Sequence, residues 1–148
     1  MYKHILVAVD GSSTSDLAIQ EAVKLAKAQR ARLRLVHVVD EVVTDSYLEF
    51  EPPEDLFESI RKRGQAVLDK AMVLVRPSGV EAETRLLELD KLMLHIADLI
   101  AAEADAWPAD LIVIGSHGRR GVRRMFLGSV AEGVARIASK PVLLIRGG

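Results

Sequence analysis

Residues 111–130 read LIVIGSHGRRGVRRMFLGSV, and the pattern in this stretch is the strongest indication of the fold. It opens with four aliphatic residues, 111–114, a run that is typical of a short buried strand. A loop with four glycines and four arginines follows over residues 115–129, and helical periodicity begins behind it. A buried strand, a glycine-rich loop and a helix in this order predict one unit of an α/β sheet.

The same alternation of strand and helix extends to both ends of the chain. Ser13 and Asp16 have the spacing of a capping box at the start of the first helix. Together the segments predict one domain, residues 1–148, with a parallel sheet and helices on both faces. The predicted strands are residues 5–9, 33–39, 80–89, 111–114 and 142–145. The predicted helical stripes consist of Ala18, Ala22, Leu25 and Ala26; Ile60, Val67, Leu68, Ala71, Leu74 and Val75; Leu92, Ile96, Leu99 and Ala102; and Val130, Val134, Ile137 and Ala138.

Composition excludes several classes of protein. The chain has 148 residues, of which 49% are hydrophobic and 28% charged, close to the globular norm. It has no cysteine, which excludes a disulfide framework, a thiolate nucleophile and a cysteine zinc site. No apolar run approaches the ~18 residues of a membrane span, and the N-terminal run is too short for a signal peptide. We therefore expect a soluble cytoplasmic protein, and its net charge of −1 gives nucleic-acid binding no support.

Two loops at strand ends are the predicted location of a ligand site. Open α/β sheets bind ligands beyond the carboxyl ends of their strands, where the strand order reverses. Residues 10–13 follow the first strand, and residues 115–129 follow the fourth. Gly115 would let a ligand approach the backbone, Gly118 permits a positive φ, and Gly128–Ser129 would begin a helix whose N–H groups attract phosphate. The pattern predicts a phosphate-binding loop, and the alternative is a glycine-rich loop whose arginines are merely solvated.

Other polar residues are assigned no chemistry. The carboxylates around residues 49–58 are interpreted as a solvated loop and helix start, and not as a metal site. His117 is interpreted as a loop residue that contacts the backbone, His95 as structural and Trp107 as packing. No base or P-loop lysine is evident, so no catalytic residue is predicted. Asp10 is a choice between a helix cap and a nucleotide contact, and its place at a strand's carboxyl end favours the nucleotide.

The chain resembles the universal stress protein family over essentially all 148 residues. The resemblance rests on the strand ends at Asp10 and Asp40, on residues 110–118 (DLIVIGSHG), and on residues 140–145 (KPVLLI). The ATP-binding branch of the family is marked by the motif G-x2-G-x9-G-[ST]. That spacing is matched without a gap by Gly115, Gly118, Gly128 and Ser129. One departure is the absence of a glycine in residues 87–93, after the third strand.

The resemblance implies a Rossmann-like, open five-stranded parallel sheet with strand order 3-2-1-4-5. It also implies an ATP site, often with a divalent metal such as Mg²⁺ held by the phosphates. Asp10 and Val38 would lie near adenine and ribose, Gly115 by the ribose, and Gly118, Gly128 and Ser129 on the phosphates. One or two of the loop arginines are expected to reach phosphate; the predicted site includes Arg119 and Val130, which adjoin Gly118 and Ser129.

The resemblance further implies a homodimer formed through strand 142–145. An independent argument agrees, because an apolar strand at a sheet edge is an aggregation hazard unless it is paired. The hypothesis is an ATP-binding regulatory protein of the stress response that acts as a homodimer, with slow ATP hydrolysis left open. Two alternatives also stay open: an ATP-using phosphoryl or adenylyl transferase on the same fold, and a dimeric interaction module that binds no nucleotide.

Overall fold

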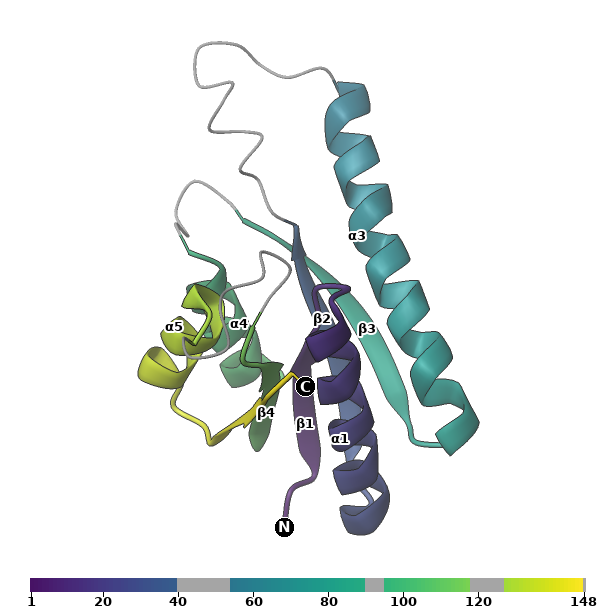
Figure 1. The fold of residues 1–148 in the computed structure, drawn as a ribbon, viewed down its shortest axis with the longest axis vertical. Helices are drawn as coiled ribbons and strands as arrows, with labels where there is room; N and C mark the ends of the chain where they lie inside the picture. Colours follow the sequence, from purple (N-terminus) through teal and green to yellow (C-terminus); the bar gives the residue numbers. More distant parts are fainter. Residues whose placement is uncertain (40–53, 90–94, 118–126, 148) are drawn as a thin grey trace.

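The protein folds around a five-stranded parallel sheet with strand order β3-β2-β1-β4-β5, as the resemblance implied (Figure 1). The computed structural model describes residues 1–39, 54–89, 95–117 and 127–147. The strands are β1 (His4–Ala8), β2 (Arg32–Val39), β3 (Ala82–Glu88), β4 (Leu111–Gly115) and β5 (Val142–Ile145). Each lies within about two residues of its predicted position, and the apolar runs of β1 and β4 are buried, as expected of inner parallel strands.

Helices cover both faces of this sheet. α1 (Ser13–Gln29) and α3 (Glu54–Val75) pack on one face, and α4 (Ile96–Ala106) and α5 (Ser129–Ile137) pack on the other (Figure 1). A short 3₁₀ helix, Arg76–Ser78, follows α3. Successive side chains of a strand point to opposite faces, so β1 contributes Ile5 and Val7 to the α1/α3 core and Leu6 and Ala8 to the α4/α5 core.

The N-cap of the first helix lies one residue earlier than predicted. Ser12, and not Ser13, is the N-cap, and its side-chain oxygen accepts a hydrogen bond from the Ser15 amide at 3.1 Å. The spacing from Ser12 to Ser15 satisfies the same geometry as the expected capping box, so adjacent serines made the sequence ambiguous. The predicted stripe of Ala18, Ala22 and Ala26 is buried as expected.

The other helical stripes are only partly correct. Leu74 and Ile137 are each 40% exposed, and Ala102 is exposed as well. Leu92 lies outside the described residues. On α4 the buried face consists of Ala97, Ile100, Glu103 and Ala104. A glutamate occupies this face because strand arginines pair with it, a tertiary contact that apolar periodicity does not reveal.

Near the amino-terminal ends of the strands, a cluster of ion pairs connects α4 to β2 and β3. The Arg34 guanidinium donates to Glu103 at 2.7 Å and to Glu83 at 2.9 Å, and lies 4.8 Å from the centre of the Trp107 ring. His4 meets Trp107 edge-on, with ring centroids 5.0 Å apart. The interpretation of Trp107 as a packing residue is therefore confirmed.

β5 lies at one edge of the sheet, and each of its four residues is only half-buried. The predicted edge position of this strand is confirmed. None of the helices in the described ranges combines the length and the apolar character needed to cross a membrane.

Candidate functional site

The strand order reverses between β1 and β4, and the two strands separate at their carboxyl ends. Their register runs from Ile5–Leu111 to Ala8–Ile114. Beyond that last pair, the Val9 amide donates to Val36 of β2 at 2.8 Å, and the Ser116 amide donates to Ile145 of β5 at 2.8 Å. Each strand end is therefore held by its outer neighbour, and the space between them is the switch point at which such sheets bind ligands.

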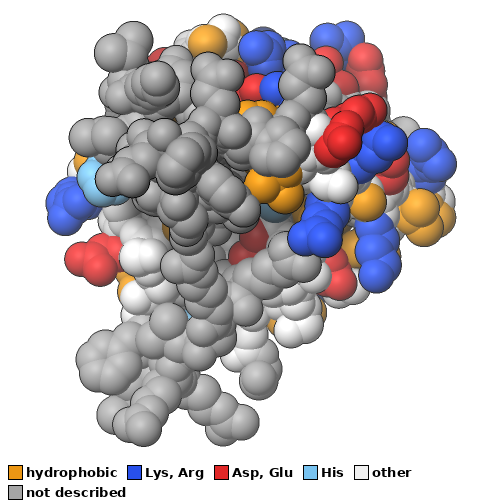
Figure 2. Space-filling view, turned by 90° about the horizontal axis from the view of Figure 1, so that it is seen from above, with side chains coloured by type: hydrophobic (Ala, Val, Ile, Leu, Met, Phe, Trp, Pro, Cys, Tyr) orange, Lys and Arg blue, Asp and Glu red, His pale blue; other side chains and the backbone are white. Residues whose placement is uncertain are grey.

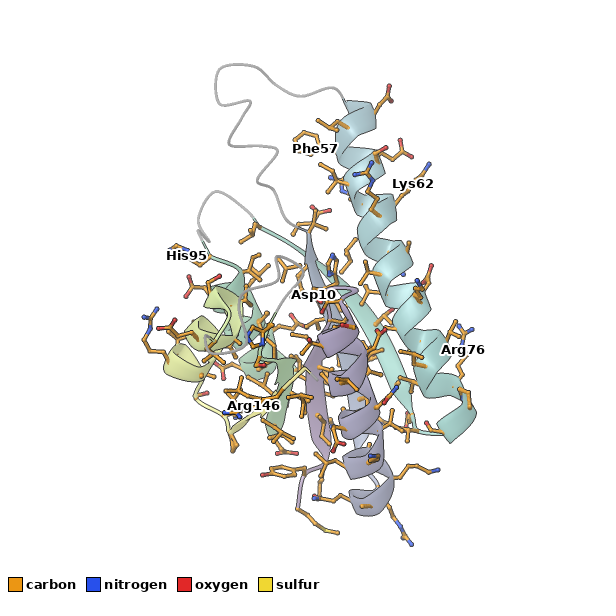
Figure 3. All side chains as sticks on the ribbon, viewed as in Figure 1. Asp10, Phe57, Lys62, Arg76, His95 and Arg146 are labelled. Atoms are coloured by element: carbon orange, nitrogen blue, oxygen red, sulfur yellow. The ribbon has the colours of Figure 1, made fainter. Side chains whose placement is uncertain are left out.

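Asp10 stands at this switch point, separated from the end of β1 by Val9, and is labelled in Figure 3. Its Oδ1 accepts from the Ser12 amide at 2.9 Å, and its own amide donates to the Ser15 hydroxyl at 3.1 Å. Gly11 between them has φ +82°, a conformation that glycine adopts without strain. The aspartate thus shapes the turn that leads into α1, while Ser12 caps the helix.

Gly115 lies at the end of β4, across the switch point from Asp10. Close packing against α1 explains why this residue has no side chain. A Cβ at this position would lie 2.8 Å from Cγ2 of Thr14, in the first turn of α1. A Cβ at Gly147 would lie 2.6 Å from the Thr14 Oγ1. The absence of both side chains lets α1 approach β4 and the end of β5. Close helix packing is a requirement on Gly115 that the sequence analysis did not identify.

Gly128, Ser129 and Val130 form the start of α5. The Gly128 amide donates to the Ser116 carbonyl at 2.7 Å, which brings the helix start to the end of β4. Gly128 is the N-cap and makes no side-chain capping bond, so the amides behind it receive no cap from that residue. Ser129 is exposed, whereas Val130 is half-buried and packs against the α4/α5 core. Ser129 and the amides of the first turn are the groups in this segment that can meet an anion.

Val38 is 7% exposed and belongs to the α4/α5 core, paired in register with Leu87 of β3. Gly118 and Arg119 lie outside the described residues, as do Arg120, Arg123 and Arg124. The structure therefore brings together Asp10, Gly115, Gly128 and Ser129 at one end of the sheet, with Val38 buried on the neighbouring strand.

Two further polar residues near the site were given too little weight by sequence reasoning. Ser116 is 4% exposed, and its hydroxyl lies 3.0 Å from the His117 Nδ1. His117 was interpreted as a loop residue that contacts the backbone, and the serine next to it in the sequence was the signal for this side-chain contact. His37 Nδ1 lies 2.7 Å from the Val9 carbonyl oxygen. In the sequence, the only indication of a role for His37 was that it is a single polar residue near the carboxyl end of an apolar strand.

The remaining polar candidates do not join the site. His95, interpreted as structural, is the exposed N-cap residue of α4 and makes no side-chain capping bond there. Within the described ranges, no three His, Asp or Glu side chains are grouped to hold a metal ion. The acidic segment 40–53 lies outside those ranges.

Figure 2 is a view onto the carboxyl ends of the strands, and on the side where α3 lies it shows Lys and Arg interleaved with Asp and Glu. Two printed ion pairs involve α3: Lys62 with Glu58, at 3.8 Å, and Arg61 with Glu88. Because opposite charges alternate among the described side chains on this side, they produce no one-signed field that would attract a polyanion. The predicted positive charge resides in the loop arginines, which are not among the described residues.

Comparison with known proteins places the chain in one family. Residues 1–146 match the universal stress protein family. The chain is 38% identical to the universal stress protein YxiE of Bacillus subtilis, with 99% of this chain and 100% of that protein covered. It is 35% identical to the universal stress protein MJ0531 of Methanocaldococcus jannaschii, with 99% and 83% covered.

Solved structures show the same fold. A universal stress protein family member from Burkholderia pseudomallei is 35% identical, with a TM-score of 0.74 and 97% and 96% of the two chains covered. The protein MJ0577 is 26% identical, with a TM-score of 0.84 and 100% and 98% covered. Sequence and fold agree over nearly the full length, and the chain belongs to the universal stress protein family.

Proposed function

We propose that this protein binds ATP between the separated ends of β1 and β4, and acts as a nucleotide-dependent regulator in the stress response. The observation that carries the proposal is the hydrogen bond from the Gly128 amide to the Ser116 carbonyl, at 2.7 Å. It sets the amino-terminal end of α5 beside the end of β4, across the switch point from Asp10. An anion bound there meets unpaired helix amides and the positive end of the helix dipole.

Two relatives of known structure support the choice of an adenine nucleotide. One is a universal stress protein in complex with cAMP, 26% identical to this chain, with a TM-score of 0.66 and 97% and 96% of the two chains covered. The other, from Archaeoglobus fulgidus, is in complex with dAMP and is 30% identical, with a TM-score of 0.69 and 97% and 98% covered. ATP in particular rests on the spacing of Gly115, Gly118, Gly128 and Ser129, which resembles the ATP-binding branch.

In this proposal each site residue has a stated role. Asp10 meets the adenosine through its carboxylate, and Val38 supports the adenine side from the core of β2. Gly115 lies by the ribose, and Gly118, Arg119 and Gly128 lie at the phosphates. Ser129 donates its hydroxyl and amide to a phosphate, and Val130 contributes its amide while its side chain packs. Mg²⁺, where present, is held by the phosphates.

A carboxylate beside the proposed phosphate site would repel the anion, so the position of the acidic residue in the first turn of α5 matters. Glu132 is the acidic residue in the first turn of α5, and it is exposed. Its amide already donates to the Gly128 carbonyl at 2.9 Å, so the helix begins normally behind the glycine. The amides of Ser129 and Val130 are thus the backbone donors that we assign to the phosphates.

Dimerisation through β5 completes the proposal. The strand is at the sheet edge, apolar and half-buried, so a second copy of the chain would cover it. The one-domain chain would then act as a homodimer whose bound nucleotide controls which partner it engages. A nucleotide exerts such control only if it binds one conformation better than another.

The test begins with the purified protein as it comes from the cell. The protein is denatured, the released nucleotide is identified by anion-exchange chromatography, and ATP, ADP, AMP and cAMP are then titrated calorimetrically with and without Mg²⁺. We expect ATP to bind most tightly of the four. Ligand at 100 times its dissociation constant stabilises by about 2.7 kcal/mol, which raises the melting temperature by several degrees.

A matched pair of serine variants localises the binding. Ser129→Ala removes a hydroxyl at the start of α5 and should weaken ATP binding, while Ser59→Ala removes an exposed hydroxyl from α3 and should not. Gly118→Val should abolish binding. If the wild-type protein releases no nucleotide, gains no thermal stability from ATP and gives no heat of binding, ATP is not its ligand. Binding that Ser129→Ala and Gly118→Val leave intact places the nucleotide elsewhere.

A further inference from the structure

We infer that His37 is a positioning residue for the nucleotide site: its side chain holds the end of β1 in the geometry that presents Asp10. The inference deepens the proposed function and rests on it. It is carried by the contact between the His37 Nδ1 and the Val9 carbonyl oxygen at 2.7 Å, together with the packing of α3 around the same ring.

The contact occurs where main-chain pairing of β1 with β2 ends. Ala8 and Val36 are the last register partners, and the Val9 amide still donates to the Val36 carbonyl at 2.8 Å. The Val9 carbonyl, the last backbone acceptor before Asp10, receives its hydrogen bond from the His37 imidazole. A side chain therefore continues the attachment of β1 to β2 just as the backbone turns away towards α1.

The chemistry of the contact fixes the tautomer of the imidazole. A carbonyl oxygen can only accept, so the His37 Nδ1 must carry the hydrogen and donate it. In the neutral ring the Nε2 is then unprotonated, so the Nδ1–H is the donor that ties the imidazole to Val9.

Helix α3 confines the ring and the turn together. A Cβ at Gly64 would lie 3.2 Å from the His37 Cδ2 and 2.8 Å from the Leu86 Cδ1, so the glycine lets α3 close over the histidine. Three residues further along α3, Val67 Cγ2 would lie 3.5 Å from a Cβ on Gly11. The imidazole and the residue after Asp10 are thus both under α3, and the ring has little room to leave the Val9 carbonyl.

Asp10 is placed by this arrangement because it directly follows Val9 in the chain. Two of its bonds lie within the turn that follows: its amide donates to the Ser15 hydroxyl at 3.1 Å, and its Oδ1 accepts from the Ser12 amide at 2.9 Å. Those bonds move with the turn. The bond from His37 ties the preceding residue to β2, and so sets where the whole turn stands relative to the sheet.

The test compares two substitutions of similar size that differ in one donor. In His37→Asn, the Asn Nδ2 can donate to the Val9 carbonyl, whereas His37→Leu has no donor. We expect His37→Leu to raise the ATP dissociation constant about 3–10-fold, the scale of one lost hydrogen bond, and His37→Asn to stay within about twofold of wild type. Exchange of the Asp10 and Ser12 amides in the ligand-free protein should accelerate in His37→Leu but not in His37→Asn.

A stability control separates positioning from general loosening. Leu68→Val shortens a fully buried α3 side chain in the same core and should lower the melting temperature without changing ATP affinity. Nitrogen NMR of the wild-type imidazole should show a protonated Nδ1. The inference is overturned if His37→Leu binds ATP as wild type does, or if Leu68→Val weakens ATP binding equally. If the wild-type protein binds no ATP at all, the proposed function is wrong, and the predicted effect of His37 on ATP affinity is wrong with it. That result differs from the two outcomes above, in which the wild-type protein does bind ATP.

Discussion

Ala8 and Ile114 are the last register partners of β1 and β4, and the site opens directly beyond them. After this pair the amide of Val9 turns to β2 and the amide of Ser116 turns to β5. The separation is a consequence of topology, because β1 and β4 lead into helices on opposite faces of the sheet. Asp10, beyond the end of β1, and Gly128, whose amide donates to Ser116 beyond the end of β4, thus border the same gap.

Gly115→Ala tests the close packing of α1 on β4. The added Cβ would lie 2.8 Å from the Thr14 Cγ2, so we expect a loss of about 1–3 kcal/mol in the free energy of unfolding. Thr14→Ser removes that methyl group and should recover part of the loss when combined with Gly115→Ala. Urea denaturation of the two single variants and the double variant gives the coupling energy. Strict additivity would show that the two positions do not clash.

Glu103→Gln tests the ion-pair cluster near the amino-terminal ends of the strands. The Glu103 side chain is 9% exposed and pairs with Arg34, whose side chain is 15% exposed. Loss of the carboxylate leaves a largely buried guanidinium with Glu83 alone, and we expect a cost of about 2 kcal/mol or more.

The control for this variant is Glu81→Gln, which breaks the pair of Glu81 with Arg32. Those two side chains are 69% and 61% exposed, so the change should cost less than about 1 kcal/mol. Both variants are compared by chemical denaturation at the same ionic strength. Equal costs would contradict the assignment of a buried, stabilising role to Glu103.

Asp110 makes stability depend on acid pH. The amides of Lys3 and His4 donate to its Oδ2 at 2.7 and 2.9 Å, and these bonds hold the pKa of the carboxyl below the ordinary 3.8. A pKa lowered in the folded state means that the stabilisation is complete above the unfolded value and is lost as the pH falls through the folded one. The stability gap between wild type and Asp110→Asn should therefore be constant near neutrality and shrink below about pH 4. A gap independent of pH would contradict this account.

Leu144→Pro tests dimerisation through β5. The carbonyls of Pro141 and Ile145 accept from β4, so by alternation along the strand the Leu144 N–H faces the open edge. Proline removes that donor, and the proposed dimer should dissociate in analytical ultracentrifugation. Leu144→Ala loses the packing of the side chain but keeps the N–H, and should remain dimeric. A wild-type monomer, or a proline variant that stays dimeric, would exclude pairing through this edge.

The order and type of the elements could be predicted from the sequence. Apolar runs such as residues 111–114, set between helical stripes, indicate a parallel sheet, because strands buried on both faces are apolar throughout. The placement of the predicted site at the ends of the first and fourth strands followed from the same pattern together with the family resemblance. Local chemistry was less secure, and the cap shifted from Ser13 to Ser12 because neighbouring serines offer the same side-chain oxygen.

The tertiary structure alone decided which residues depend on one another across the sheet. Gly115 leaves room for Thr14, Glu103 forms an ion pair with Arg34, and the His37 imidazole contacts the Val9 carbonyl. The two residues of each pair are far apart in the chain. Hydrophobic periodicity predicts only whether a side chain faces the core. It does not predict which residue from a distant part of the chain that side chain contacts. A polar residue on an apolar face acquires its meaning from that partner, and the partner is fixed only when the strands pair and the helices pack.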